Sequence, residues 1–244
     1  MATAGYDNNE PIRKRSGWLI PLAVFIVTFA LSAAILVYYL APRPSSFAGE
    51  QPSVTSRTDP VSLRVHGLNL SVPANYIVYE SAREGGERTD LAMEAAMPDY
   101  RGYAAKDAAI FASNAADSQV VYLLLREEKL NFSEADRLKR IYMNYVAEPN
   151  GSEGPFGLTQ YAFRDDSGYH AEDLFVGTTP KGLVVMRCVR FSQSVSNPSC
   201  LRDVQIAHGV ALTYRFKRAY LSHWREIASG VENLIHGFIA KAKV

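Results

Sequence analysis

The most prominent pattern in the chain is an uncharged apolar run from Trp18 to Leu40. A helix rises about 1.5 Å per residue, so a run of this length can cross a hydrocarbon core of roughly 30 Å. A cleaved signal peptide is the alternative, but its apolar core is shorter. The candidate cleavage site at residues 46–48 also lies several residues beyond the run. The pattern therefore predicts an uncleaved transmembrane helix.

Basic residues are unequal on the two sides of this run. Arg13, Lys14 and Arg15 precede it closely, whereas only Arg43 follows it closely. Because an excess of Lys and Arg stays on the cytoplasmic side, the N-terminus is expected inside and the remainder of the chain outside.

This orientation divides the chain into four predicted parts. Residues 1–17 form a cytoplasmic tail and residues 18–40 the transmembrane helix. Residues 41–59 are rich in Pro, Ser, Thr and Gly, which is typical of a flexible linker. Residues 60–244 form one extracytoplasmic domain, which is long enough for a single well-buried core.

The domain opens with two alternating apolar runs on either side of His66-Gly67. A two-residue turn pairs Val65 with Leu68, Leu63 with Leu70 and Val61 with Val72, so all six side chains share one face. This pattern predicts a β-hairpin.

A second alternating pair, residues 204–214, predicts another hairpin near the C-terminus. A three-residue turn, Ala207-His208-Gly209, would pair Ile206 with Val210 and Val204 with Leu212.

Short apolar runs separated by turn residues predict further strands over residues 91–97, 120–126, 158–164, 169–176 and 183–191. Helical spacing of apolar residues predicts one helix capped by Ser133 and ending before Pro149, and another over residues 219–242. A weaker helical pattern covers residues 104–113. The expected fold class is α+β: a single N-terminal transmembrane helix, then an antiparallel sheet with two or three packing helices.

Charge excludes one class of partner. Residues 60–244 carry equal numbers of basic and acidic side chains, 21 of each. This balance gives no electrostatic basis for binding nucleic acid.

The two cysteines, Cys188 and Cys200, both fall in the predicted outer domain and bracket a turn-rich stretch. Disulfides persist in oxidising compartments, and closing a loop of this size stabilises a fold by roughly 3 kcal/mol. A structural disulfide is therefore expected. Two free buried thiols and a redox-active pair are the alternatives, although the spacing is not C-x-x-C.

No catalytic, nucleotide-binding or metal-binding motif occurs in the sequence, so no catalytic residue, cofactor or metal ligand is predicted. The one polar pair that stands out is His170 and Glu172, which would share a face of the strand predicted at 169–176. Such a pair can begin a metal site or an acid–base pair. The alternative is an ordinary polar outer face of that strand.

The organisation resembles that of single-pass proteins of the bacterial inner membrane, with the domain in the periplasm. We therefore expect a membrane-anchored envelope protein that is not an enzyme, whose domain serves binding, sensing or assembly. The expected partners are the lipid bilayer and an envelope protein. A homodimer can form through the small-residue pairs Thr28/Ser32 and Ala30/Ala34. The alternatives are a membrane-tethered periplasmic enzyme, hydrolase-like with an unrecognised site, and a small subunit of a membrane complex.

Overall fold

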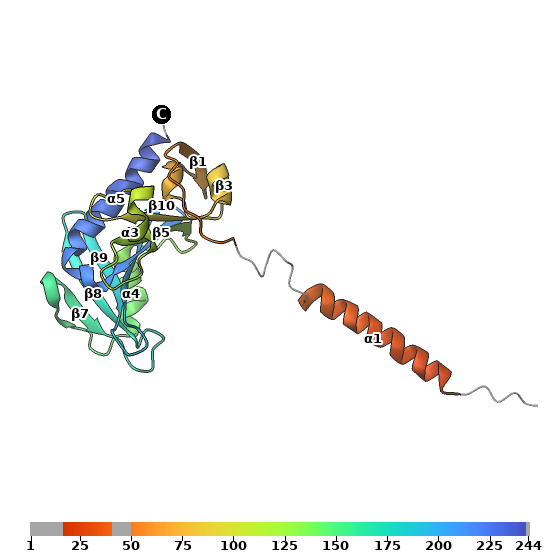
Figure 1. The fold of residues 1–244 in the computed structure, drawn as a ribbon. Helices are drawn as coiled ribbons and strands as arrows, with labels where there is room; N and C mark the ends of the chain where they lie inside the picture. Colours follow the sequence, from red (N-terminus) through yellow and green to blue (C-terminus); the bar gives the residue numbers. More distant parts are fainter. Residues whose placement is uncertain (1–16, 41–49, 243–244) are drawn as a thin grey trace, which may run out of the picture. The chain divides into compact units, whose positions relative to one another are not determined.

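The computed structural model describes residues 17–40 and 50–242, which belong to two compact units that divide after Gly49. The first unit contains one helix, α1 (Leu19–Leu40), at the position predicted for the transmembrane segment (Figure 1). Its length and composition are sufficient to cross a membrane, a test that a signal sequence also passes. Residues 1–16 of the predicted tail and 41–49 of the predicted linker lie outside the described residues.

The remainder of the predicted linker, residues 50–59, belongs to the domain. The Glu50 carboxylate accepts a hydrogen bond from the Ser81 amide at 2.7 Å, and the Ser53 amide donates to the Val78 carbonyl at 3.0 Å. The Arg83 guanidinium donates to the Ser53 hydroxyl at 3.0 Å and to its carbonyl. The expectation of a flexible linker through residue 59 is therefore wrong here, because these polar groups find partners on the domain.

A small sheet contains the first predicted hairpin, β1 (Pro60–Val65) and β2 (Leu68–Pro73), with the register that the sequence predicts. His66 and Gly67 both have positive φ, as a tight two-residue hairpin turn requires. A short strand, β3 (Gly86–Arg88), pairs parallel to β1. It was not predicted because three residues without apolar alternation carry no strand signal.

The large sheet has the order β4-β5-β11-β10-β9-β8-β7-β6 and is antiparallel throughout. The strands from β6 to β11 lie side by side in chain order, and β5 then pairs with the last strand, β11. The bounds are β4 Asp90–Ala96, β5 Val120–Glu127, β6 Ser152–Glu153, β7 Thr159–Ala162, β8 Glu172–Thr179, β9 Gly182–Val189, β10 Ser199–Ala207 and β11 Val210–Lys217.

The second predicted hairpin, β10–β11, is correct at one pair and wrong at the other. Val204 lies opposite Leu212 as expected, but Val210 pairs with Ala207 instead of Ile206. The extra residue forms a β-bulge between Gln205 and Ala207, so the turn contains only two residues.

Three helices occur in residues 50–242: α3 (Ala108–Ala112), α4 (Glu134–Arg140) and α5 (Trp224–Lys241). The Ser133 hydroxyl caps α4 by accepting from the Asp136 amide at 3.1 Å, as predicted. The expected continuation of α4 to Pro149 is wrong, because the chain turns into a 3₁₀ segment, Tyr142–Asn144. Another 3₁₀ segment, Arg218–His223, precedes α5.

The main core lies between one face of the large sheet, the small sheet and α5, with Trp224, Ile227 and Val231 of the helix fully buried. Figure 1 shows α5 at the blue end of the chain beside the small sheet. On the opposite face of the large sheet, residues around α4 bury a second cluster over β7–β9. A third, small cluster lies at α3. The α+β fold class is confirmed.

Candidate functional site

His170 and Glu172 do not share a strand face. Strand β8 begins at Glu172, so His170 lies in the preceding turn, where its Nδ1 is 3.1 Å from the Ser167 carbonyl. Glu172 instead pairs with Arg187 at 2.7 Å. The Arg187 guanidinium also lies over the ring of Tyr169. Because each member has a different partner, the arrangement gives no support to an acid–base pair.

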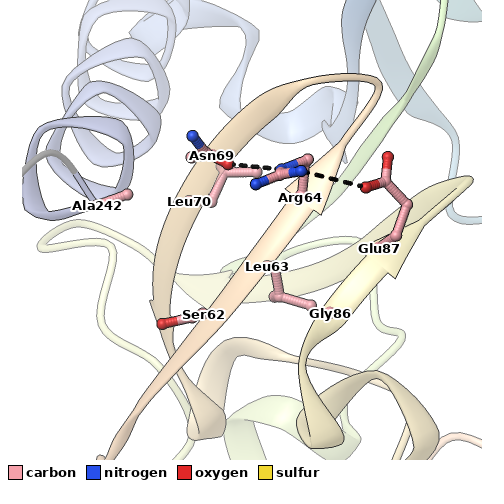
Figure 2. A pocket seen from close by; sticks show the side chains of 8 residues that line it. All are labelled: Ser62, Leu63, Arg64, Asn69, Leu70, Gly86, Glu87 and Ala242. Carbon is pink, nitrogen blue, oxygen red and sulfur yellow. Dashed lines mark hydrogen bonds and ion pairs between the residues drawn. The ribbon is translucent and has the colours of Figure 1, made fainter.

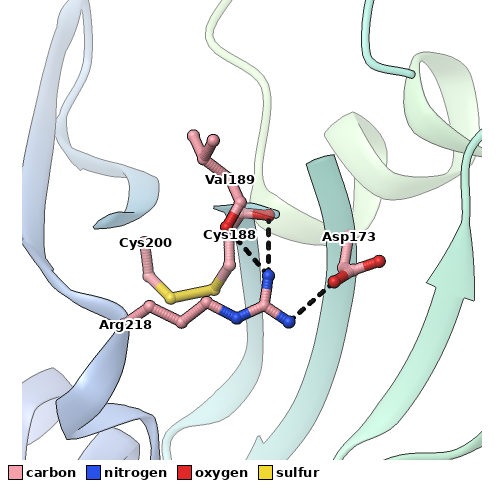
Figure 3. Close-up of a disulfide and its surroundings, with 5 residues drawn as sticks. All are labelled: Asp173, Cys188, Val189, Cys200 and Arg218. Carbon is pink, nitrogen blue, oxygen red and sulfur yellow. Dashed lines mark hydrogen bonds and ion pairs between the residues drawn. A yellow bond between two sulfur atoms is a disulfide. The ribbon is translucent and has the colours of Figure 1, made fainter. Parts of the chain in front are cut away.

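Cys188 and Cys200 lie directly opposite each other on β9 and β10 and are joined by a disulfide. Both are fully buried, and their Cα atoms are 3.9 Å apart. Arg218 runs beside the bond, donating to the Val189 carbonyl at 2.9 Å and to Asp173 at 2.7 Å (Figure 3). Burial raises the pKa of Asp173, but hydrogen bonds from Arg218 and Arg190 outweigh it and hold that pKa below its usual value.

A buried charge network surrounds Arg202, which is 3% exposed. Its guanidinium donates to Glu134 at 2.9 Å and to the Tyr214 hydroxyl at 3.1 Å, and lies 3.4 Å from Glu232. Burial alone would lower the pKa of Arg202, but Glu134 and Tyr214 raise it, and burial raises the pKa of Tyr214 to about 12. A small cavity of about 210 Å³ adjoins this network. Its lining includes Arg202, Glu134 and Glu232, whose charges are paired with one another. The network links α4 and α5 to the sheet.

A second cavity of about 490 Å³ lies on the small sheet, between β1–β3 and the end of α5. Figure 2 shows Arg64 between Asn69, which accepts a hydrogen bond at 2.9 Å, and Glu87 at 3.9 Å. The Arg64 and Glu87 side chains are more than half exposed, so this cavity is an open polar surface with weak ion pairing.

The strongest candidate site is a cavity of about 520 Å³ on the outer face of β4, β5, β11 and β10. This is the sheet area between the clusters at α3 and α4, which no helix among residues 50–242 covers. We call it the outer groove. Its principal side chains are Ala92, Glu94, Tyr122, Leu124, Leu201, Thr213 and Arg215, and residues 52 and 78–79 form one wall.

Strand register explains how these side chains meet. Ala92, Leu124 and Thr213 lie in one row across β4, β5 and β11. Because side chains alternate along a strand, the residues two positions away form the next row on the same face. That row is Glu94, Tyr122 and Arg215, and it continues to Leu201 on β10.

Three ionisable side chains lie next to one another in this second row: Glu94, Tyr122 and Arg215. The Arg215 guanidinium lies 4.9 Å from the Tyr122 ring centroid, a cation–π contact. Burial raises the pKa of Glu94, and burial together with the nearby Glu94 carboxylate raises the pKa of Tyr122. A mostly apolar concavity of several hundred Å³ with few polar groups is typical of a binding site.

The described residues contain no group of three or more His, Cys, Asp or Glu side chains placed to hold a metal ion. The sequence carried a partial signal for the groove, because β5 is apolar at nearly every position and so must have two apolar faces. It could not show which face lacks a covering helix.

No family model matches the chain, and neither does any curated protein. Among solved structures, the chain is similar to Smlt3025, an immunity protein of the Stenotrophomonas maltophilia type IV secretion system. The TM-score is 0.52 at 15% identity, covering 74% of this chain and 93% of that chain. FrpD, an iron-regulated outer membrane lipoprotein of Neisseria meningitidis, gives a TM-score of 0.47 at 14% identity, with 78% and 97% covered. The likeness to the immunity protein is one of fold.

Proposed function

We propose that this chain is a single-pass protein of the bacterial cell envelope whose domain binds a segment of a partner protein in the outer groove. The observation that carries the proposal is the groove itself, a mostly apolar concavity between α3 and α4 that residues 50–242 leave uncovered. Uncovered apolar concavities on a folded domain mark interaction sites.

The anchor supports an envelope location, because an apolar N-terminal helix fits a membrane-anchored or secreted protein. The similarity in fold to an immunity protein of a secretion system fits a domain that acts by binding another protein. The proposal places the domain in the periplasm, where the disulfide persists. The proposed function is compatible with dimerisation through α1 and with assembly into a larger membrane complex.

The orientation is tested with reporter fusions after residue 60. Because Arg13, Lys14 and Arg15 favour a cytoplasmic N-terminus, an alkaline-phosphatase fusion should be active and a cytoplasmic reporter inactive. The same fusions with these three residues changed to Asn should show a weaker bias. The opposite pattern in the unmodified chain would place the domain in the cytoplasm.

Binding in the groove is tested with Leu124→Glu, which puts a charge on the apolar floor. The tagged full chain is purified in mild detergent from its own cells, and each co-purifying protein is identified, purified and titrated against the chain. We expect one such protein to bind wild type and to lose at least about tenfold in affinity for Leu124→Glu, because a buried unpaired charge must be desolvated. Leu130→Glu is the matched control, since Leu130 is 65% exposed and does not line the groove.

Thermal unfolding separates loss of binding from loss of fold. Both variants should unfold within a few degrees of wild type, because neither residue belongs to a buried cluster. If the partner bound Leu124→Glu as tightly as it binds wild type, the outer groove would not be its binding site.

A membrane-tethered enzyme is the second candidate, favoured by the convergence of Glu94 and Tyr122 in one concavity. Turnover of any hydrolase substrate class that is abolished by Glu94→Gln and unaffected by Leu130→Glu would establish it over the binding module.

A further inference from the structure

A smaller cavity, of about 150 Å³, adjoins the outer groove, and we call it the side pocket. The two cavities share Pro52, Val78 and Glu94 as lining residues. Glu94 is the only ionisable carboxylate among the side-pocket residues. A partner segment in the outer groove can therefore extend one side chain past Glu94 into the side pocket.

The Glu94 carboxylate is partly buried without compensation. Among residues 17–40 and 50–242, no hydrogen bond or ion pair satisfies it. Desolvation of an unpaired carboxylate opposes its charged form, which is the physical cause of its raised pKa. A cation brought to this position would be stabilised by the carboxylate that the fold leaves unpaired.

A second acceptor lines the same pocket. The Asn75 amide nitrogen donates to the Tyr103 carbonyl at 2.9 Å, and this fixes the amide orientation because a carbonyl can only accept. The Asn75 side-chain oxygen is then buried without a hydrogen-bond partner in the described chain. A buried acceptor without a partner is uncommon in native proteins, so the Asn75 oxygen indicates a missing donor in the pocket that the partly buried Glu94 carboxylate also lines.

Aromatic rings complete the pocket. Tyr103 and Phe111 meet edge to face with centroids 5.4 Å apart, and Tyr76 also lines the cavity. Aromatic faces attract ammonium and guanidinium groups and exclude water from them. Carboxylate, amide oxygen and aromatic rings together form a lining that suits a cation on an apolar stem.

The wall of the pocket is held in place before any partner arrives. Residues 52–55 line it, and Arg83 fastens them by donating to the Ser53 hydroxyl and carbonyl and to the Ile77 carbonyl. A preformed wall reduces the ordering that binding requires.

On the basis of this lining we propose that the side pocket receives a lysine or arginine side chain of the partner segment bound in the outer groove, and that Glu94 pairs with it. The inference rests on the proposed function and adds the chemistry of the partner: an apolar protein segment interrupted by one cation. Charge complementarity with Glu94 and the donor required by Asn75 select this occupant over an uncharged one.

The test selects random dodecapeptides displayed on phage against the full chain in dodecyl maltoside and discards those that also bind Leu124→Glu. The remaining peptides are expected to carry Lys or Arg beside apolar residues. Each is resynthesised with norleucine in place of the cation, and affinities are measured by fluorescence anisotropy. Replacing the cation with norleucine should weaken binding to wild type about tenfold, but should weaken binding to Glu94→Gln less than about twofold. A double-mutant cycle requires this difference if the cation pairs directly with Glu94.

Glu127→Gln is the control, because Glu127 is an exposed carboxylate on the neighbouring strand β5 and lines neither the outer groove nor the side pocket. It should behave as wild type. Glu94→Gln should unfold at the wild-type temperature or slightly above it, since it removes an unpaired, partly buried charge.

The possible failures are distinguishable. Groove-dependent peptides that lack a cation, or an equal norleucine effect on wild type and Glu94→Gln, would overturn the inference and leave the proposed function standing. Failure to select any peptide that discriminates against Leu124→Glu would overturn both.

Discussion

Replacing Arg202 with methionine is expected to lower the free energy of unfolding by about 3–5 kcal/mol. Arg202 is 3% exposed and is hydrogen-bonded to Glu134, with Glu232 at 3.4 Å. The substitution leaves the Glu134 carboxylate, whose side chain is 9% exposed, without its cation. The loss therefore reflects an uncompensated buried charge more than the energy of the pair itself.

The measurement is urea unfolding of the full chain in detergent, followed by tryptophan fluorescence. Arg64→Met is the matched control, because Arg64 is more than half exposed and 3.9 Å from its acidic partner. It should change stability by less than about 0.5 kcal/mol.

A second variant tests the cause. Adding Glu134→Gln to Arg202→Met removes the unpaired charge, while the amide oxygen can still accept from the Val185 amide, as Glu134 does at 2.8 Å. The double variant should recover about 1–2 kcal/mol of the loss, a coupling of the size found between neighbouring residues. If Arg202→Met alone destabilised by less than about 1 kcal/mol, the network would not be holding α4 and α5 to the sheet.

The fold was predictable where the sequence pattern is local. Alternation around His66-Gly67 determined both the faces and the register of β1 and β2, and the structure confirms each pair. Ser133 identified the start of α4, because a cap acts on the next turn of the same helix. The bulge near Gln205 carried no such signal, since skipping one residue leaves the composition of the run unchanged.

The candidate site was not predictable, because it depends on contacts between segments distant in the sequence. Leu123 and Leu124 are adjacent and chemically identical, yet one faces the core and the other the outer groove. Which face a helix covers is decided by tertiary packing. Similarly, the sequence shows Glu94 only as a polar residue of a strand. The structure shows that its carboxylate lines a cavity with aromatic rings and has no ion pair or hydrogen bond within residues 50–242.

The carboxylates of Glu134 and Asp173 differ from that of Glu94 in whether they have partners. Glu134 and Asp173 are buried and fully paired with arginines, which is the arrangement of groups that stabilise a fold. Glu94 is partly buried in a concavity and has no ion pair or hydrogen bond within residues 50–242, which makes it a candidate for pairing with a bound ligand. This contrast, more than the size of the cavity, distinguishes the outer groove from the other cavities.

Removing the disulfide with Cys188→Ala and Cys200→Ala together is expected to lower the free energy of unfolding by about 2–4 kcal/mol. The bond closes the loop between β9 and β10, so its loss increases the conformational freedom of the unfolded chain. Alanine is chosen because both sulfurs are fully buried and a serine hydroxyl there would add a desolvation penalty.

Binding in the outer groove should be unchanged in the folded double variant. The cysteines face the main core, whereas Leu201, the next residue along β10, lines the groove on the opposite face. Two hydrogen bonds also hold the start of β10 when the disulfide is absent. The Arg218 amide donates to the Pro198 carbonyl at 3.0 Å, and the Lys217 ammonium donates to the Asn197 carbonyl at 3.3 Å. Urea unfolding and anisotropy with the groove-dependent peptides measure the two properties separately. A double variant of wild-type stability that no longer bound these peptides would make the pair a redox-active part of the site, and a scaffold role would be wrong.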